Sequence, residues 1–454
     1  MNNTISHSKI VALILCLVIT ACSVYTKPWQ RKRAIIYDVA SYYAYLPAAF
    51  IYKDFSLNFI HFLPSNEPYD GVWVNNYEDK QVIKYTMGLA YFYYPGFVVA
   101  DLYTMMQKRY NRNGYSLPYQ LALSITALLL GLCSIFLLRY FLSFFFGDKV
   151  IALLLPAMVL GTNYLHYVIA EPGMSHAYSF FLVLVLSISS EKFKQTSKVK
   201  WLLTMAFVLG FLVLIRPTNL LFGFFPLWLN GRQIVRFLKR NHKNYVFLMG
   251  ALILGVLPFI PQMVYWKEIT GHWIFYSYGD EHFFFKNPHI WKGLFGFRKG
   301  LFLYTPILLF SIPGLYFLGK NNGQKRWLFP ISIVLFLAFW VLFSWWCWWY
   351  GGGFGMRALI EFYPFFALLM GATFQKLFRY QFQKPLTIIV ALLVGLNLFQ
   401  TWQYDKTIIH WEAMSKEAYF KVFLKTKFPE NYQRLLRKPN VVCALKYGHE
   451  NCED

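Results

Sequence analysis

Residues 118–138 read PYQLALSITALLLGLCSIFLL, a run that contains no charged side chain. A helix of roughly 20 predominantly apolar residues is long enough to cross the hydrocarbon core of a bilayer. The whole chain has the same character, because 57% of its 454 residues are apolar and only 14% are charged. A soluble domain carries about 25% charged residues. The sequence therefore predicts an all-α polytopic membrane protein.

The apolar runs predict about eleven transmembrane helices, and the basic residues between them set the orientation. Lys and Arg gather in alternate short connections, whereas the connections at 171–173 and 346–356 contain neither. Because basic short loops stay in the cytoplasm, we expect a plasma (inner) membrane protein with a cytoplasmic N-terminus. The predicted spans cover residues 9–25, 118–138, 150–170, 174–190, 201–215, 217–230, 245–266, 300–318, 327–345, 357–375 and 385–403.

The net charge of +23 is explained by these basic cytoplasmic loops. Basic loops hold a membrane protein against anionic lipid headgroups. Membrane lipids are therefore expected partners, and nucleic acid is not.

Residues 26–117 are predicted to form one long external loop. Within it, residues 87–106 are apolar enough to be a span, but they contain Pro95-Gly96 and Asp101. A span there would turn the basic loops downstream to the outside. We therefore expect one or two helices lying in the outer interface. The transmembrane domain then covers 1–404, and the charged residues 405–454 form an external tail.

The first candidate for chemistry is Asp38, in the aromatic stretch that opens the external loop. A carboxylate beside a substrate hydroxyl can act as a general base. An acidic residue just before a helix can also be an N-cap, so both interpretations of Asp38 stay open. Tyr42 and Tyr43 follow one turn later and are candidate substrate-binding residues, because their rings offer an apolar face and a polar tip.

Three further ionisable residues fall at predicted span ends. Glu171 and His176 flank the second external connection, and Arg216 precedes Pro217, which ends a half-length helix. Such side chains are costly unless they line a wet cavity or meet a counterion. We therefore expect Glu171 near Asp38, with His176 donating to a phosphate or sugar oxygen. The alternatives are a solvent-facing Glu171 and a helix-start His176.

A glycine-rich stretch follows the tryptophans at 345–349. Successive glycines let backbone N–H groups approach an anion, and Arg357 adds a bidentate donor suited to phosphate. Gly352, Gly353 and Arg357 are therefore candidate phosphate-binding residues. Two rivals remain. Glu361 lies one turn after Arg357 and can pair with it, and tryptophan clusters often form an interfacial belt.

The six cysteines show no metal-ligand spacing, so no metal site is predicted, although participation of a divalent ion is left open. Cys443 and Cys452 lie in the tail and would form a disulfide in an oxidising compartment; a pair of free thiols is the alternative. Residues 9–22 end in Ile-Thr-Ala-Cys, like a lipoprotein signal. An uncleaved first span is the preferred interpretation.

Five motifs follow one another along this topology. They are YDVASYYAYLPAAFIYKD (37–54), EPGMSHAYSFFL (171–182), IRPTN (215–219), RKGLFLYTPIL (298–308) and GGGFGMR (351–357). In this order the chain resembles the type-C integral membrane glycosyltransferases, the superfamily of the protein mannosyltransferases and the lipid A aminoarabinose transferases. The resemblance covers roughly residues 9–375.

The resemblance implies transfer of a sugar from a polyprenyl-phosphate donor to a lipid or glycan acceptor on the external face. It implies that Asp38 is the general base and Glu171 the second acid. Arg357, together with Arg216, would hold the donor phosphate. No organic cofactor is implied.

The sequence also departs from the family. Val39 follows Asp38 where many members have a second acid, and Cys347 stands where oligosaccharyltransferases have the acid of Trp-Trp-Asp. Two rival functions are a lipid-linked glycan polymerase or ligase, and a transporter or flippase without transferase activity. A transporter would show repeated halves, which the sequence does not display.

Overall fold

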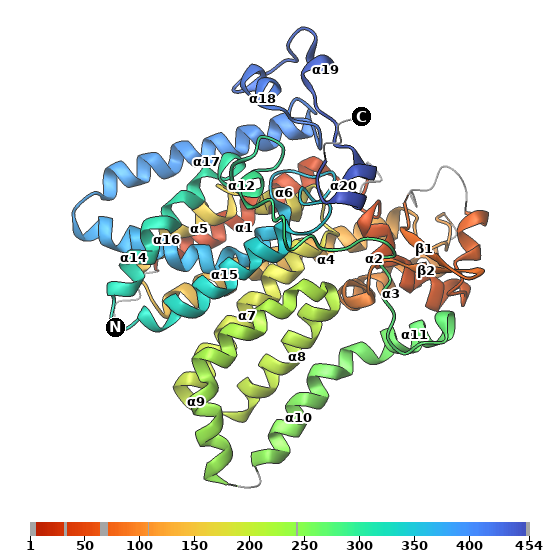
Figure 1. Cartoon of the computed structure of the whole chain (residues 1–454), viewed down its shortest axis with the longest axis horizontal. Helices are drawn as coiled ribbons and strands as arrows, with labels where there is room; N and C mark the ends of the chain where they lie inside the picture. The colour runs from red at the N-terminus through yellow and green to blue at the C-terminus, as the bar shows by residue number, and fades with distance from the viewer. Residues whose placement is uncertain (1–5, 31–33, 64–70, 108, 242–243, 451–454) are drawn as a thin grey trace. The chain divides into compact units, whose positions relative to one another are not determined.

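The computed structural model describes residues 6–30, 34–63, 71–107, 109–241 and 244–450. Helices dominate (Figure 1), and the only strands in these described ranges are β1 (Val74–Tyr77) and β2 (Lys80–Ile83). The chain divides into two compact units, each assembled from segments distant in the sequence. The first unit comprises residues 1–17, 135–166 and 280–454, and the second unit comprises 18–134 and 167–279.

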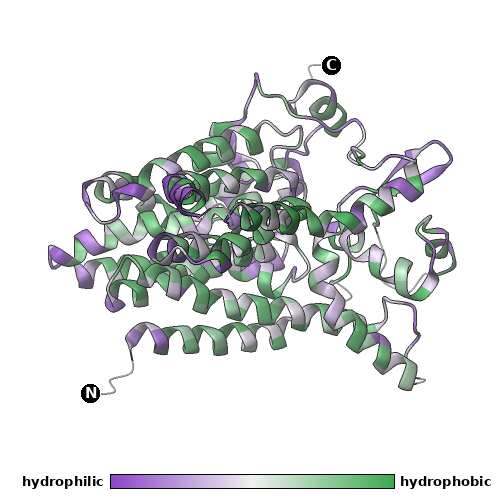
Figure 2. Cartoon of the chain, turned by 90° about the horizontal axis from the view of Figure 1, so that it is seen from below, coloured by the Kyte–Doolittle hydropathy of each residue, from purple (hydrophilic) through white to green (hydrophobic). Residues whose placement is uncertain are grey.

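Six helical segments of the described chain are long and apolar enough to cross a membrane. Figure 2 shows long helices that are coloured hydrophobic along much of their length, and these helices support the predicted all-α membrane fold. The other predicted spans correspond to helices that are shorter, broken or less apolar. The structure therefore supports six of the roughly eleven predicted transmembrane helices by length and composition. The six segments are His7–Thr26, Leu117–Ser143, Asn244–Thr270, Lys325–Phe343, Arg357–Arg379 and Gln383–Asp405.

The first unit is built around one central helix. In Arg357–Arg379 the most apolar window is 94% buried, whereas in Gln383–Asp405 it is 22% buried. The second of these helices therefore keeps an apolar face outside the protein core, as a lipid-facing helix does. The unit holds the start of α1 (His7–Thr26), the end of α4 (Leu117–Ser143), α5 (Asp148–Val159), part of α6 (Tyr164–Ile169), α12 (Ile290–Phe295), α13 (Leu301–Tyr304), η6 (Pro306–Phe310), α14 (Ser311–Lys320), η7 (Lys325–Trp327), α15 (Leu328–Phe343), η8 (Arg357–Phe362), α16 (Tyr363–Arg379) and α17 (Gln383–Asp405).

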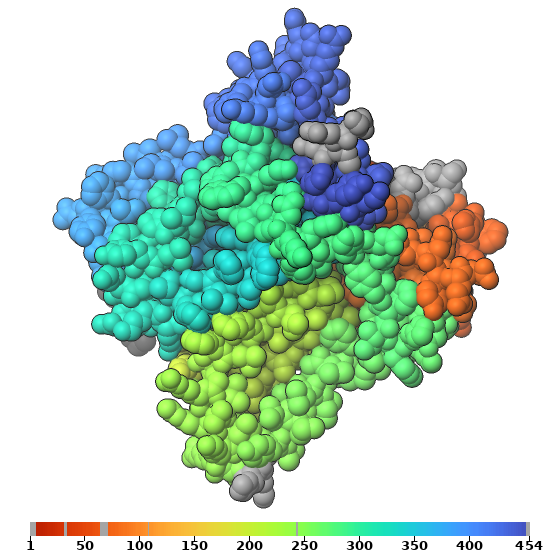
Figure 3. Space-filling model, viewed as in Figure 1, coloured from red at the N-terminus to blue at the C-terminus, as the bar shows by residue number. Residues whose placement is uncertain are grey.

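The C-terminal tail adds three short helices to the first unit, α18 (Lys416–Val422), α19 (Tyr432–Leu435) and α20 (Val441–Tyr447). Its apolar side chains share one buried cluster with Tyr304 and Phe354. Figure 3 shows the blue tail packed against the green segment that leads into α13. Cys443 is disulfide-bonded; Cys452 lies outside the described residues.

The second unit contains the described residues of the loop predicted at 26–117 and a helical hairpin region. Helices α7, α8 and α10 pack side by side (Figure 1). A Cβ on Gly210 of α8 would lie 2.1 Å from the carbonyl oxygen of Gly255, so glycine permits this close helix approach. The elements are the end of α1, α2 (Asp38–Pro47), η1 (Ala48–Tyr52), η2 (Asn58–Phe62), β1, β2, η3 (Met87–Leu89), α3 (Ala90–Met106), the start of α4, the end of α6, α7 (Ser175–Thr196), α8 (Val199–Ile215), η4 (Pro217–Gly223), α9 (Phe224–Arg240), α10 (Asn244–Val256), η5 (Leu257–Phe259) and α11 (Ile260–Thr270).

Two helix boundaries test the sequence predictions. Helix α8 ends at Ile215 and Arg216 is extended, with φ −149°, which confirms the predicted break before Pro217. The helix expected over 150–170 is interrupted, because α5 ends at Val159 and α6 starts only at Tyr164. Asn163, in the gap between them, donates its amide to the carbonyl of Phe354, so this break is fixed by a tertiary contact.

Candidate functional site

Asp38 is the first residue of α2, and its carboxylate is half-buried. The N-cap position is taken by Tyr37, one residue earlier than the capping interpretation required. A carboxylate in the first turn is still favoured by the helix dipole. The hydroxyl of Tyr85 donates to Asp38 Oδ1 at 3.1 Å. Asp38 is therefore oriented by a side chain from a different part of the external loop.

The two tyrosines predicted beside Asp38 differ in their surroundings. Tyr42 stacks on Tyr85, with ring centroids 4.8 Å apart, so it supports the residue that holds Asp38. Tyr43 is 1% exposed, and its hydroxyl donates to the carbonyl of Gly114 at 2.6 Å. This placement makes Tyr43 a core residue, with a packing role in place of the predicted contact with substrate.

The connection 171–173 packs directly on the start of α2. A Cβ placed on Gly173 would lie 2.2 Å from Cγ1 of Val39, so the Val39 side chain can pack on this backbone only because residue 173 is glycine. Tyr93 donates its hydroxyl to the carbonyl of Gly173. Val39 is the neighbour of Asp38, and Glu171, which is half-buried, is two residues from Gly173. The structure thus brings the two predicted acids to the same region of the second unit.

Arg216 and His176 are also joined within the second unit. The Arg216 guanidinium approaches His176 Nδ1 at 3.2 Å, and His176 is 3% exposed against the ring of Tyr167. A guanidinium only donates, so Nδ1 is the acceptor in this hydrogen bond. His176 therefore holds Arg216 in place, a role that the sequence did not predict.

Three residues of the glycine-rich stretch have positive φ angles. Gly351 has φ 64°, Gly353 has φ 153° and Gly355 has φ 61°, conformations that side chains rarely adopt. The N–H of Gly353 donates to the carbonyl of Trp411 at 3.3 Å. This backbone donor is thus used inside the protein, against the predicted anion cradle. Gly352 lies under the same Trp411 ring.

Lys299 ties this glycine stretch to the tail. It is 2% exposed, and its ammonium donates to the carbonyl of Gly353 and, at 2.5 Å, to that of Trp411. Sequence reasoning missed Lys299 because a lysine next to Arg298 in a loop is usually solvated. Arg357, at the start of η8, is half-buried, and Glu361, one turn later, is 1% exposed.

The tryptophans before the glycine stretch are core residues. Trp348 and Trp349 are each 1% exposed, so for these two the interfacial-belt interpretation is wrong. Trp349 donates its indole N–H to Glu412 at 2.9 Å, and Trp348 donates to Glu450 at 3.1 Å. Two tail carboxylates therefore bind this cluster.

The environment of Glu450 perturbs its ionisation. Burial opposes the charged form, but hydrogen bonds from Trp348 and from Lys292, at 3.0 Å, outweigh it, so the pKa of Glu450 is lowered. The carboxylate is thus ionised at neutral pH and anchors the end of the described tail.

The predicted site residues fall into two sets. Asp38, Glu171, His176 and Arg216 belong to the second unit, whereas Arg357 belongs to the first, with the two glycines before it. Only the first set is brought together by contacts within one unit. Within the described residues no group of three His, Cys, Asp or Glu side chains is arranged to hold a metal ion.

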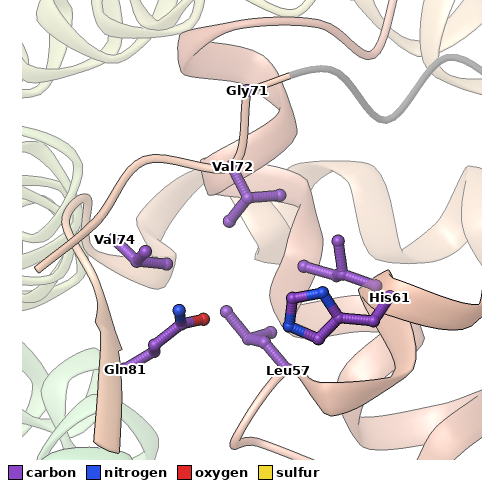
Figure 4. A pocket seen from close by; sticks show the side chains of 7 residues that line it. Leu57, His61, Gly71, Val72, Val74 and Gln81 are labelled. Carbon is purple, nitrogen blue, oxygen red and sulfur yellow. The ribbon is translucent and has the colours of Figure 1, made fainter. Parts of the chain in front are cut away.

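A pocket of about 240 Å³ lies in the second unit, beside the start of α2 (Figure 4). Gly71, on its wall, lies against the backbone of Tyr37; a Cβ there would be 3.4 Å from Tyr37 Cα. The N–H of Trp73 donates to Ser41 Oγ at 2.7 Å. Residues 71–74, which form part of the pocket wall, therefore pack against the first turn of α2, which carries Asp38.

No protein-family model matches the sequence, and no curated protein matches it either. The resemblance to membrane glycosyltransferases therefore rests on the five sequence motifs alone.

Proposed function

We propose that this protein transfers a sugar from a polyprenyl-phosphate donor to a lipid or glycan acceptor on the external face of the plasma (inner) membrane. The contact between Gly173 and Val39 carries the proposal. It brings the connection with Glu171 onto the helix turn with Asp38, and paired carboxylates are the groups that acid–base chemistry at a sugar needs.

Asp38 is the general base of the proposed reaction. Its carboxylate takes the proton of the acceptor hydroxyl while that oxygen forms a bond to the anomeric carbon. The bond from the anomeric carbon to the phosphate oxygen breaks, and polyprenyl phosphate leaves with the electron pair. The hydrogen bond from Tyr85 orients the carboxylate, and Glu171 positions the acceptor.

Arg216 binds the donor phosphate in this proposal, and the phosphate-binding role that the sequence resemblance implies for Arg357, in the first unit, is tested by substitution. A guanidinium suits phosphate because it donates two parallel hydrogen bonds, and it stabilises the charge that develops on the leaving group. His176 supports this role for Arg216 by fixing the guanidinium at 3.2 Å. No cofactor is invoked.

The proposed topology has about eleven spans, a cytoplasmic N-terminus and an external tail. A group of cations on the α7–α8 turn and on α9 supports it, because basic residues gather on the cytoplasmic side. Gln233 joins the two elements by donating to the carbonyl of Phe193 at 2.9 Å and to Ser197 Oγ at 2.5 Å. The cations are Lys194, Lys198, Lys200, Arg232, Arg236, Lys239 and Arg240.

The test uses the full-length protein in lipid vesicles, with a polyprenyl-phosphate monosaccharide labelled in the sugar and a membrane extract as acceptor. We expect release of polyprenyl phosphate together with labelled acceptor. Asp79→Asn, which changes an exposed carboxylate of the β1–β2 turn, is the matched control for Asp38→Asn. Activity only with a lipid-linked oligosaccharide would indicate a polymerase or ligase. Movement of intact donor across the bilayer without release would indicate a flippase.

A further inference from the structure

The pocket in Figure 4 has a lining that suits one kind of ligand. Four of its seven lining residues are aliphatic, and its polar side chains come from His61 and Gln81. None of the seven is Asp, Glu, Lys or Arg. The lining thus offers apolar walls and two groups that can donate and accept hydrogen bonds. The aliphatic residues are Leu57, Ile60, Val72 and Val74.

The absence of a cation from this lining argues against the donor phosphate as occupant. Phosphate binding in proteins relies on guanidinium, ammonium or converging backbone N–H groups. A hydroxyl-bearing neutral molecule needs no counterion, and an amide and an imidazole match hydroxyl groups as donor and acceptor. The pocket is also smaller than the roughly 300–1,000 Å³ of a typical ligand site, so it suits a single ring.

Exposed aromatic residues adjoin the pocket. Phe62 follows His61 in the chain, Trp73 lies between two lining valines, and Tyr37 contacts Gly71. Phe62 is 85% exposed, Tyr37 63% and Trp73 47%. Aromatic rings with one apolar face and a polar edge are suited to ligands that are apolar on one side and polar on the other. The C–H face and the hydroxyl rim of a sugar ring have this character.

From this lining and its position, we infer that the pocket is the acceptor subsite and binds an uncharged carbohydrate ring. The inference rests on the proposed function and names its acceptor class. A ring in the pocket lies beside the turn that carries Asp38, because Gly71 packs on Tyr37 and Trp73 is bonded to Ser41.

The test measures binding directly, so it does not depend on catalysis. Full-length protein in nanodiscs is titrated with the methyl glycosides of glucose, galactose, mannose and N-acetylglucosamine, followed by saturation-transfer NMR. We expect at least one neutral glycoside to bind. His61→Ala and Gln81→Ala should each weaken it about tenfold, the effect of one lost hydrogen bond. His282→Ala, at an exposed imidazole of the first unit, is the matched control.

The outcomes separate this inference from the proposed function. Binding of none of the four glycosides, binding unchanged by both pocket substitutions, or equal binding of glucose 1-phosphate would overturn the assignment. If the glycosides bind as expected but wild-type protein releases no polyprenyl phosphate, the proposed function fails and the carbohydrate subsite stands.

Discussion

Replacing Gly173 by Ala tests the contact on which the candidate site depends. The added methyl group would lie 2.2 Å from Cγ1 and 2.9 Å from Cγ2 of Val39, where carbon atoms normally stay about 3.5–4.0 Å apart. Overpacking of this kind costs about 1–3 kcal/mol. Since Val39 adjoins Asp38, the displacement should lower transferase activity as well as the free energy of unfolding.

Val39→Ala should relieve the clash, because the nearest remaining Val39 atom, Cβ, lies 3.1 Å away. We therefore expect the double variant Gly173→Ala/Val39→Ala to be roughly 1–3 kcal/mol more stable than the sum of the two single destabilisations predicts. Denaturant titration in mixed micelles measures this coupling, and labelled-sugar transfer measures activity. Gly231→Ala is the control, because a Cβ there meets nothing within 4 Å. Unchanged stability of Gly173→Ala, or additive effects in the double variant, would refute the packing argument.

Three further predictions concern the first unit. Lys299→Met should destabilise the protein by about 1–3 kcal/mol, as measured by denaturant titration, because it leaves the carbonyl of Gly353 without its ammonium donor. Because the pKa of Glu450 is lowered in the folded protein, its carboxylate stabilises the fold fully at neutral pH, and this stabilisation is lost as the pH falls through the lowered pKa. Glu450→Gln should lack this loss of stability in acid, as measured by its thermal unfolding at a series of pH values. Arg357→Ala should raise the donor KM about tenfold or more, whereas an unchanged KM in initial-rate measurements would favour pairing with Glu361.

The long apolar helices were the part of the fold that the sequence predicted most readily. Long apolar runs such as 118–138 have few stable arrangements apart from a helix in lipid, and α4 covers this run. The helix break at Arg216 was equally easy to predict, because Pro217 cannot continue a helix. The helix break at Asn163 could not be predicted, since it depends on the carbonyl of Phe354, which lies far along the chain.

The candidate site was predicted in part. The sequence identified Asp38 and Glu171 by the cost of placing carboxylates beside apolar spans, and the contact of Gly173 with Val39 agrees with their expected proximity. It did not identify Lys299, whose importance comes from being enclosed by the tail. The pocket was also missed, because its wall includes the β1–β2 hairpin, which lies in a loop with no clear alternation of apolar residues.

The most direct test of the central claim is sugar transfer by Asp38→Asn in native membranes, compared with Asp79→Asn and wild type. General-base catalysis contributes about 10²–10⁴-fold, so transfer should fall by at least about a hundredfold, with donor binding and membrane insertion unchanged. Transfer at the wild-type rate by Asp38→Asn would contradict the role of this carboxylate and, with it, the proposed mechanism.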